Sequence, residues 1–182
     1  MLTKDQLLSS MRHETNVIKH LASKITPDLL EWRPTPGQRS FDELLKYLTV
    51  SAEIPCVNLF TGNWDHAEAR SKLTESVTLD NFADAMDEQM NKLDELIRDV
   101  DVASALETDA TLPWGAPIKQ GQGFIDMPLK ALVAYRMQLF LYLKQAGMSE
   151  LNSANCWVGV DMKPPAADGE GDGDGDGDDG DA

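Results

Sequence analysis

The sequence predicts an all-α fold in which four helices form a bundle. Apolar residues recur at alternating spacings of three and four in four separate stretches, and two of these stretches open with a capping box. No stretch gives a strong strand signal. With 182 residues, 42% of them hydrophobic, the chain is long enough to bury one sizeable core. We therefore expect one bundle domain over residues 1–162 and a tail over residues 163–182.

The first helix is predicted over about residues 4–24. Thr3 and Gln6 have capping-box spacing at its start, and the buried face repeats through Leu8, Met11, Thr15, Ile18, Ala22 and Ile25. The stretch ITPDLLEWRPTPG, residues 25–37, follows with three prolines. Because proline cannot continue a helix, we expect a loop here, anchored by Trp32.

The second helix is predicted to begin at Ser40, which forms a capping box with Glu43. Pro55 must either kink this helix or end it. A third helix is predicted over residues 79–100, where apolar residues again follow helical spacing and Asp80 is the candidate N-cap.

Residues 101–126 contain LPWGAPIKQGQGF, whose two prolines and three glycines favour a long irregular loop or a short hairpin. The fourth helix is predicted over residues 127–146, with Asp126 as its N-cap and Gly147 as its stop. Trp157 and Val158, in the segment after it, are expected to pack back onto the bundle.

The formal net charge is -15, and about half of it lies at one end. Residues 168–181, DGEGDGDGDGDDGD, hold eight carboxylates and no base, which predicts a disordered acidic tail. The rest of the chain is also acidic, which argues against nucleic-acid binding. Part of the tail resembles the start of an EF-hand loop, but no glutamate stands at the twelfth position, so specific calcium binding is not expected. This part is Asp172, Asp174, Asp176 and Gly177.

The N-terminal stretch MLTKDQLLSS lacks the apolar run of a signal peptide, and no apolar segment approaches the ~20 residues of a membrane span. We therefore expect a soluble, cytoplasmic protein with no membrane partner. Cys56 and Cys156 belong to no metal-binding or redox motif, so they are predicted to be ordinary thiols, with a disulfide between them left open.

Arg136 lies on the apolar face of the predicted fourth helix. A buried guanidinium without a partner is very costly, so its head group should reach a carboxylate or water. Glu14, Glu53 and Asp94 are the candidate partners. The alternative is that the stem packs on the core while the charged end reaches solvent.

Three stretches carry a family resemblance: WRPTPGQRS at residues 32–40, SFDELLKYL at residues 40–48 and ALVAYRMQLFLYLKQAG at residues 131–147. Together they resemble the DinB/YfiT-like four-helix-bundle proteins, whose second helix follows a W-x-P-x-P-G loop. The segment NSANCWVGVD is similar to a capping segment found in part of that family. The resemblance covers nearly all of residues 1–162 and implies an up-down-down-up order of helices.

The resemblance also implies a divalent metal held by three histidines, one from the second helix and two from the fourth. The matching positions here are Tyr47, Ala131 and Tyr135, none of which is a good ligand for zinc or nickel at neutral pH. His13 and His20 are predicted to face solvent, and His66 to lie in a loop. We therefore expect a degenerate metal site, with no bound metal and no cofactor. The family's metal-dependent hydrolase or thiol-transferase chemistry remains the alternative.

The candidate pocket comprises Tyr47, Ala131, Tyr135 and Arg136, with Trp114 from the long loop. Two phenols and a guanidinium suit a small anionic or aromatic ligand. Alternatively, Tyr47 and Tyr135 pair and fill the former metal cavity, leaving a structural plug.

Two classes of function follow. The first is a metal-free protein that binds a small ligand or serves as a scaffold. The second is a metal-independent enzyme in which Tyr135 or Tyr47 acts as an acid and Arg136 stabilises an anion. An enzyme requires an open pocket at these residues, whereas a scaffold tolerates a filled one.

A homodimer is predicted from the fourth helix. Ala134, Met137 and Leu141 lie on its nominally polar side, where they would otherwise face water. Either another helix of the bundle or a second subunit would cover them.

Overall fold

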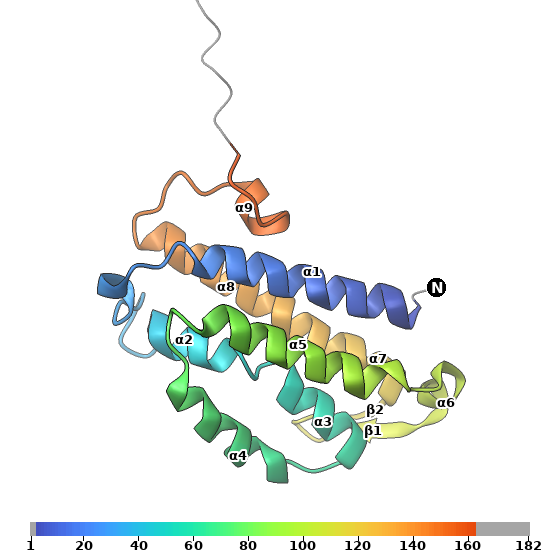
Figure 1. The fold of residues 1–182 in the computed structure, drawn as a ribbon. Helices are drawn as coiled ribbons and strands as arrows, with labels where there is room; N and C mark the ends of the chain where they lie inside the picture. The colour runs from blue at the N-terminus through green and yellow to red at the C-terminus, as the bar shows by residue number, and fades with distance from the viewer. Residues whose placement is uncertain (1–2, 163–182) are drawn as a thin grey trace, which may run out of the picture.

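The computed structural model describes residues 3–162, and the fold is all-α, as the sequence predicts (Figure 1). The main helices are α1 (Lys4–Ala22), α2 (Phe41–Leu48), α3 (Glu53–Thr61), α4 (Asp65–Leu73), α5 (Phe82–Arg98) and α8 (Lys130–Gln145). The shorter elements are η1 (Pro27–Leu29), η2 (Thr74–Ser76), α6 (Val102–Glu107), β1 (Asp109–Thr111), β2 (Pro117–Lys119), α7 (Gln120–Phe124), η3 (Ile125–Leu129) and α9 (Ser153–Trp157). The tail predicted over residues 163–182 lies outside the described residues.

Helix α1 packs against both α5 and α8, while α2 packs on α8 and α3 packs on α5. Figure 1 shows α1 and α8 running in one direction and α2 and α5 in the other, which is the up-down-down-up order. The core side chains between these helices include Met11, Ile18, Leu21, Leu44, Leu48, Met86, Leu93, Leu132, Leu139 and Leu143. Among residues 3–162, no helix is long and apolar enough to cross a membrane.

Both predicted capping boxes form. Thr3 Oγ1 accepts a hydrogen bond from the Gln6 amide at 3.2 Å, and Ser40 Oγ accepts one from the Glu43 amide at 3.3 Å. In each box the side chain of the later residue accepts a hydrogen bond from the backbone amide of the capping residue. These local bonds satisfy amides that a helix start leaves without partners.

The predicted second helix is broken between α2 and α3, ahead of Pro55. The buried side chain of Gln89 from α5 bonds the backbone groups that the break leaves without helical partners. Its Oε1 accepts hydrogen bonds from the amides of Ala52 and Glu53 at 3.0 and 3.2 Å. Its Nε2 donates to the carbonyl of Leu48 at 3.0 Å. Pro55 therefore sits in the first turn of α3, where a missing backbone amide has little cost.

Two helix starts differ from the sequence prediction. Helix α5 begins at Phe82, not at residue 79, and Asp80 is not its cap. The fourth helix begins at Gln120 rather than at residue 127, because α7, the π-helical segment η3 and α8 form one continuous run. Asp126 lies inside that run and accepts a hydrogen bond from Gln122 at 3.0 Å.

The sequence did not predict that this run starts at Gln120, because Gly121 and Gly123 lower the helix propensity of its first turn. Gly123 has a packing reason to be there: a Cβ at this position would lie 2.6 Å from Leu59 Cδ2, so glycine lets α7 approach α3 closely. The hairpin alternative for residues 101–126 is correct, because β1 and β2 pair antiparallel with Ala110 opposite Ile118. Gly147 ends α8 with a φ of 111°, as predicted.

The C-terminal segment packs across α1 through α9. Its buried residues are Ala154, Asn155 and Cys156, whereas Trp157 and Val158 are each 60% exposed. The Trp157 ring still packs on the bundle, with its centroid 4.7 Å from the guanidinium carbon of Arg136, so the prediction is confirmed for Trp157, although the buried contacts come from its neighbours. The carbonyl of Cys156 in this helix accepts a hydrogen bond from Arg136 Nη1. Both cysteines are free and buried.

Candidate functional site

Tyr47 from α2 and Tyr135 from α8 form a pair at the position where the resemblance implies a metal. Their hydroxyl oxygens lie 3.3 Å apart, and their rings meet edge to face with centroids 4.8 Å apart. Ala131 lies one turn before Tyr135 in α8 and is half-buried. The two rings occupy the space between these helices.

Arg39 packs on one member of this pair, with its guanidinium carbon 4.0 Å from the centroid of the Tyr47 ring. Burial, followed by the hydrogen bond with Tyr135, raises the pKa of Tyr47 to about 12. The Tyr47 phenol therefore stays protonated at neutral pH and offers no phenolate to a metal ion.

Arg136 is buried on a different side of α8. Its Nε lies 2.8 Å from Glu14 Oε2 of α1, its Nη1 donates to the carbonyl of Cys156, and its guanidinium carbon lies 4.7 Å from the centroid of the Trp157 ring. The arginine is 1% exposed, so of the two alternatives the buried ion pair is the one that forms.

The other two candidate partners of Arg136 are paired elsewhere. Glu53 binds Arg70, with Oε2 and Nη2 2.7 Å apart, and Asp94 binds Arg12 at the same distance. Sequence alone did not select among the three acids because each lies on a buried helix face.

The five predicted pocket residues do not line one common pocket. The tyrosines face one another between α2 and α8, while Arg136 faces α1 and α9. Trp114 lies in the turn between β1 and β2 and is 68% exposed. Adjacent residues of a helix point about 100° apart, so Tyr135 and Arg136 serve different interfaces.

The histidines are also dispersed. His13 is exposed and donates from Nε2 to the carbonyl of Trp157 at 2.7 Å. His20 does not face solvent as predicted: the C-terminal segment covers it, with Asn155 Nδ2 lying 3.2 Å from its Nε2. His66 lies in α4 rather than in a loop and donates to the carbonyl of Ile54 at 3.0 Å. Within residues 3–162, no three His, Cys, Asp or Glu side chains are grouped to hold a metal ion.

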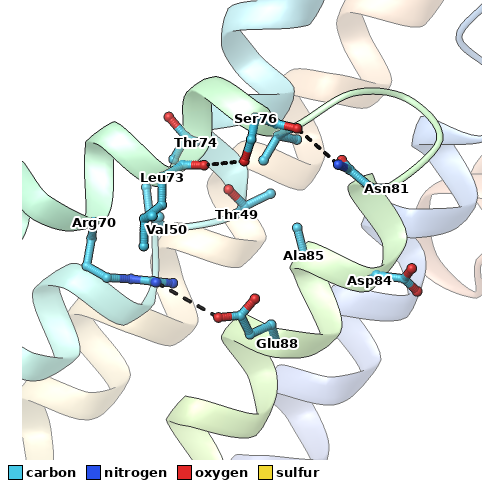
Figure 2. A pocket seen from close by; sticks show the side chains of 11 residues that line it. Thr49, Val50, Arg70, Leu73, Thr74, Ser76, Asn81, Asp84, Ala85 and Glu88 are labelled. Atoms are coloured by element: carbon cyan, nitrogen blue, oxygen red, sulfur yellow. Dashed lines mark hydrogen bonds and ion pairs between the residues drawn. The ribbon is translucent and has the colours of Figure 1, made fainter.

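A hollow of about 370 Å³, called here the α4–α5 pocket, was not predicted from the sequence (Figure 2). Two of its lining side chains form an ion pair, with Arg70 Nη1 3.9 Å from Glu88 Oε1. The pocket is lined by Thr49, Val50, Arg70, Leu73, Thr74, Ser76, Val77, Asn81, Asp84, Ala85 and Glu88. No sequence signal identified it, because α4 has no buried residue and so lacks the apolar spacing that predicts a helix.

A second, more open hollow of about 730 Å³, called here the α8 groove, runs between α8 and the proline-rich loop. It includes the three residues on which the dimer prediction rests, Ala134, Met137 and Leu141. Leu141 is 48% exposed, and Ala134 is exposed as well, so no helix among residues 3–162 covers this face.

No protein-family model matches the chain. It is similar to YjoA of Bacillus subtilis, an uncharacterized protein, with 24% identity over 157 residues that cover 83% of this chain and 96% of YjoA. The crystal structure of YjoA, a DinB-like protein, superposes with a TM-score of 0.60 at 20% identity and covers 81% of this chain and 95% of that one. A protein assigned to the DinB family from Exiguobacterium sibiricum superposes with a TM-score of 0.64 at 20% identity, covering 84% and 98%. The chain has the fold of the DinB-like proteins.

Proposed function

We propose that this DinB-like bundle works without a bound metal, as a small-ligand-binding or scaffold protein. The single observation that supports this proposal is the contact of Tyr47 with Tyr135, whose hydroxyl oxygens are 3.3 Å apart. The two rings occupy the place where the resemblance implies histidines. Among the alternatives raised by the sequence, this arrangement favours a structural plug over an open pocket.

The chemistry of the three positions supports the same conclusion. Ala131 has no donor atom, and burial keeps the Tyr47 phenol protonated by raising its pKa to about 12. Metal catalysis requires several protein ligands together with an open coordination position. The metal-dependent hydrolase or thiol-transferase alternative is therefore disfavoured.

A metal-independent enzyme that uses Tyr135 and Arg136 is also disfavoured. Arg136 is already committed to Glu14 at 2.8 Å and to the carbonyl of Cys156, and it is 1% exposed. A guanidinium placed to stabilise a substrate anion must be reachable from the same cavity as the acid.

Restoring the histidines tests the proposal. The variant Tyr47→His/Ala131→His/Tyr135→His places three imidazoles at these positions and is expected to bind about one zinc or nickel ion per chain. The unmodified protein, purified without a histidine tag or chelator, is expected to contain far less metal than protein. Elemental analysis measures both. The double variant Tyr47→Phe/Tyr135→Phe is the control for removing the phenols without adding ligands.

Two results would count against the proposal. Stoichiometric zinc or nickel in the unmodified chain would show that the site is not degenerate. A folded triple-histidine variant that takes up no metal would show that these three positions do not converge on one ion.

We propose further that two copies of the chain pair through the α8 groove. The sequence analysis considered that either another helix or a second subunit buries this face of α8. Because Ala134 and Leu141 are exposed within residues 3–162, we favour a second subunit. Light scattering coupled to size exclusion should give a dimer for the unmodified chain and a monomer for Leu141→Glu. A monomeric unmodified chain contradicts this pairing.

A cytoplasmic location stays a prediction.

A further inference from the structure

Another hollow, called here the α6 pocket, lies where α1 begins and α5 ends, and its volume is about 210 Å³. Figure 1 shows the start of α1, the end of α5, α6 and α7 at this same end of the bundle. The lining residues are Thr3, Lys4, Leu7, Ile97, Val100, Val102, Ala105, Leu106, Gly121, Phe124 and Ile125. Residues from α1, α5, α6, α7 and η3 therefore converge on one space.

The floor and the rim of the α6 pocket are both apolar. Buried side chains form the floor, namely Leu7, Ile97, Ala105 and Phe124. The rim is formed by Val102, Leu106 and Ile125, which are 46%, 52% and 37% exposed. Large apolar side chains that are exposed together mark a binding surface, whereas scattered ones do not. A molecule with an apolar body would cover the rim and release the water on it.

The size of the pocket limits what it can hold. An apolar cavity of ~150 Å³ is large enough to bind benzene, and drug-sized ligands occupy ~300–1,000 Å³. The α6 pocket, at about 210 Å³, lies between these limits. It suits one ring with a short side chain, or a short alkyl chain, and is too small for a peptide helix.

Lys4 is the charged residue in this lining. Its Nζ donates to the carbonyls of Arg98 and Val100, each at 2.7 Å. Because Val100 also lines the pocket, these two bonds hold the ammonium at the edge of the hollow. An ammonium has three donors, so one remains, and Lys4 forms no ion pair within residues 3–162.

The charge of the pocket is opposite to that of the chain. The chain has a net charge of -15, yet no acidic residue of the described chain lines the α6 pocket. An apolar lining with one positive charge at its edge complements a molecule that joins an apolar body to one negative charge. A single remaining donor suits a carboxylate, whereas a phosphate dianion requires more donors.

We propose that the α6 pocket binds a small carboxylic acid with an apolar ring or short chain. Its body lies against Leu7, Ile97 and Phe124, and its carboxylate meets the Lys4 ammonium. This site is separate from the tyrosine pair between α2 and α8, so ligand binding here does not depend on what occupies that position.

Calorimetric titration of the whole protein with four probes tests the assignment. Hydrocinnamate is expected to bind with one site per chain and a Kd of about 1 mM or tighter. Hydrocinnamyl alcohol lacks the charge, acetate lacks the apolar body and phenethylamine reverses the charge, so each should bind at least about tenfold more weakly. The net negative charge of the chain favours the amine, so a preference for the acid reports a local contact.

Lys4→Met should weaken hydrocinnamate binding about tenfold and leave hydrocinnamyl alcohol binding unchanged, because only the acid uses the ammonium. The alcohol thereby reports whether the pocket survives the substitution. The matched control is Lys19→Met on the same helix. Lys19 pairs with Asp87 at 2.5 Å and does not line the pocket, so the affinity for hydrocinnamate should not change.

Leu106→Ala tests the apolar contact. It should weaken both hydrocinnamate and its alcohol at least about threefold, because it removes part of the rim. Leu73→Ala is the control, since Leu73 is similarly exposed, at 59%, and lies on α4 outside this pocket. Circular dichroism reports whether the helices are retained in each variant.

Four results would overturn the proposal. Hydrocinnamate that does not bind, or binds no more tightly than its alcohol, removes the role of the charge. Equal losses of acid and alcohol in Lys4→Met would make the lysine a structural residue only. Equal losses in Lys4→Met and Lys19→Met would reduce the effect to overall charge.

The fourth result assigns the rim to another occupant. If no probe binds and Leu106→Glu converts a dimer into a monomer, a second copy of the chain covers Val102, Leu106 and Ile125. None of these results depends on metal content, so this inference and the metal-free proposal can fail separately.

Discussion

Arg136 is the largest side chain in the fully buried core. A guanidinium is tolerated there because Glu14 supplies a charge at 2.8 Å, the carbonyl of Cys156 accepts from its Nη1, and Trp157 lies over its face. The arginine thereby joins α1, α8 and the C-terminal segment. A residue that seemed out of place on an apolar helix face is the contact on which three elements depend.

Arg136→Leu should lower the free energy of unfolding by about 3–5 kcal/mol, because it leaves Glu14 buried without a compensating charge. Glu14→Leu/Arg136→Leu should be clearly more stable than the single variant, since neither charge is then left alone. Urea denaturation measures both. Equal destabilisation in the single and double variants would mean that the charge of Glu14 is not the source of the loss.

Tyr47 predicts a pH dependence at the alkaline end. Its pKa is raised to about 12 in the folded state, mainly by burial, against ~10 in an unfolded chain. The folded state therefore holds the proton more tightly, and this stabilisation is present below pH ~10 and lost as the pH rises towards about 12.

Tyr47→Phe should lose less stability than the unmodified protein over that alkaline range. Denaturant unfolding at a series of pH values compares them, and the difference between the two curves removes the contribution of lysines common to both. Parallel losses would show that another group is responsible.

At the scale of the elements, the break between α2 and α3 is held by one side chain from another helix. Gln89 bonds the amides of Ala52 and Glu53 and the carbonyl of Leu48, and it is 1% exposed. A helix break leaves backbone groups without partners, and buried ones must be satisfied. The interruption is thus a consequence of packing against α5.

Gln89→Leu should therefore destabilise the protein by more than about 2 kcal/mol, since each buried backbone group left without a partner costs about 1–3 kcal/mol. Asn91→Leu, at an exposed position of the same helix, is the control and should change stability by less than about 0.5 kcal/mol. Thermal and urea unfolding report both. A neutral Gln89→Leu variant would show that the break is satisfied by other means.

At the scale of the whole molecule, the net charge of -15 is concentrated at the C-terminal end. Residues 168–181 carry eight acidic side chains and no apolar side chain that could pack on the bundle. The sequence assigns the folding unit to residues 1–162, and that assignment stays a prediction.

A chain ending at Met162 should unfold at the same urea midpoint as the full chain when salt screens the charges. At low salt it should be slightly more stable, because like charges have been removed. If the shorter chain does not fold, residues after 162 contribute to the stability of the bundle and the predicted boundary is wrong.

The sequence by itself determined the features that arise within a few neighbouring residues. The capping boxes at Thr3 and Ser40, the stop at Gly147 and the all-α class follow from hydrogen bonds and periodicities that span only a few positions. The candidate metal position at Tyr47, Ala131 and Tyr135 is implied by the family resemblance, which rests on motifs that each lie within a short stretch of the chain.

Only the tertiary structure decided the rest. The choice of Glu14 for Arg136, the cover over His20, the bond from Gln89 to the broken helix and the hollow behind α4 each join residues separated by more than fifteen positions. Short-range spacing carries no information about such contacts, because several candidates satisfy it equally. Which of these candidate contacts forms is determined by how the helices pack against one another.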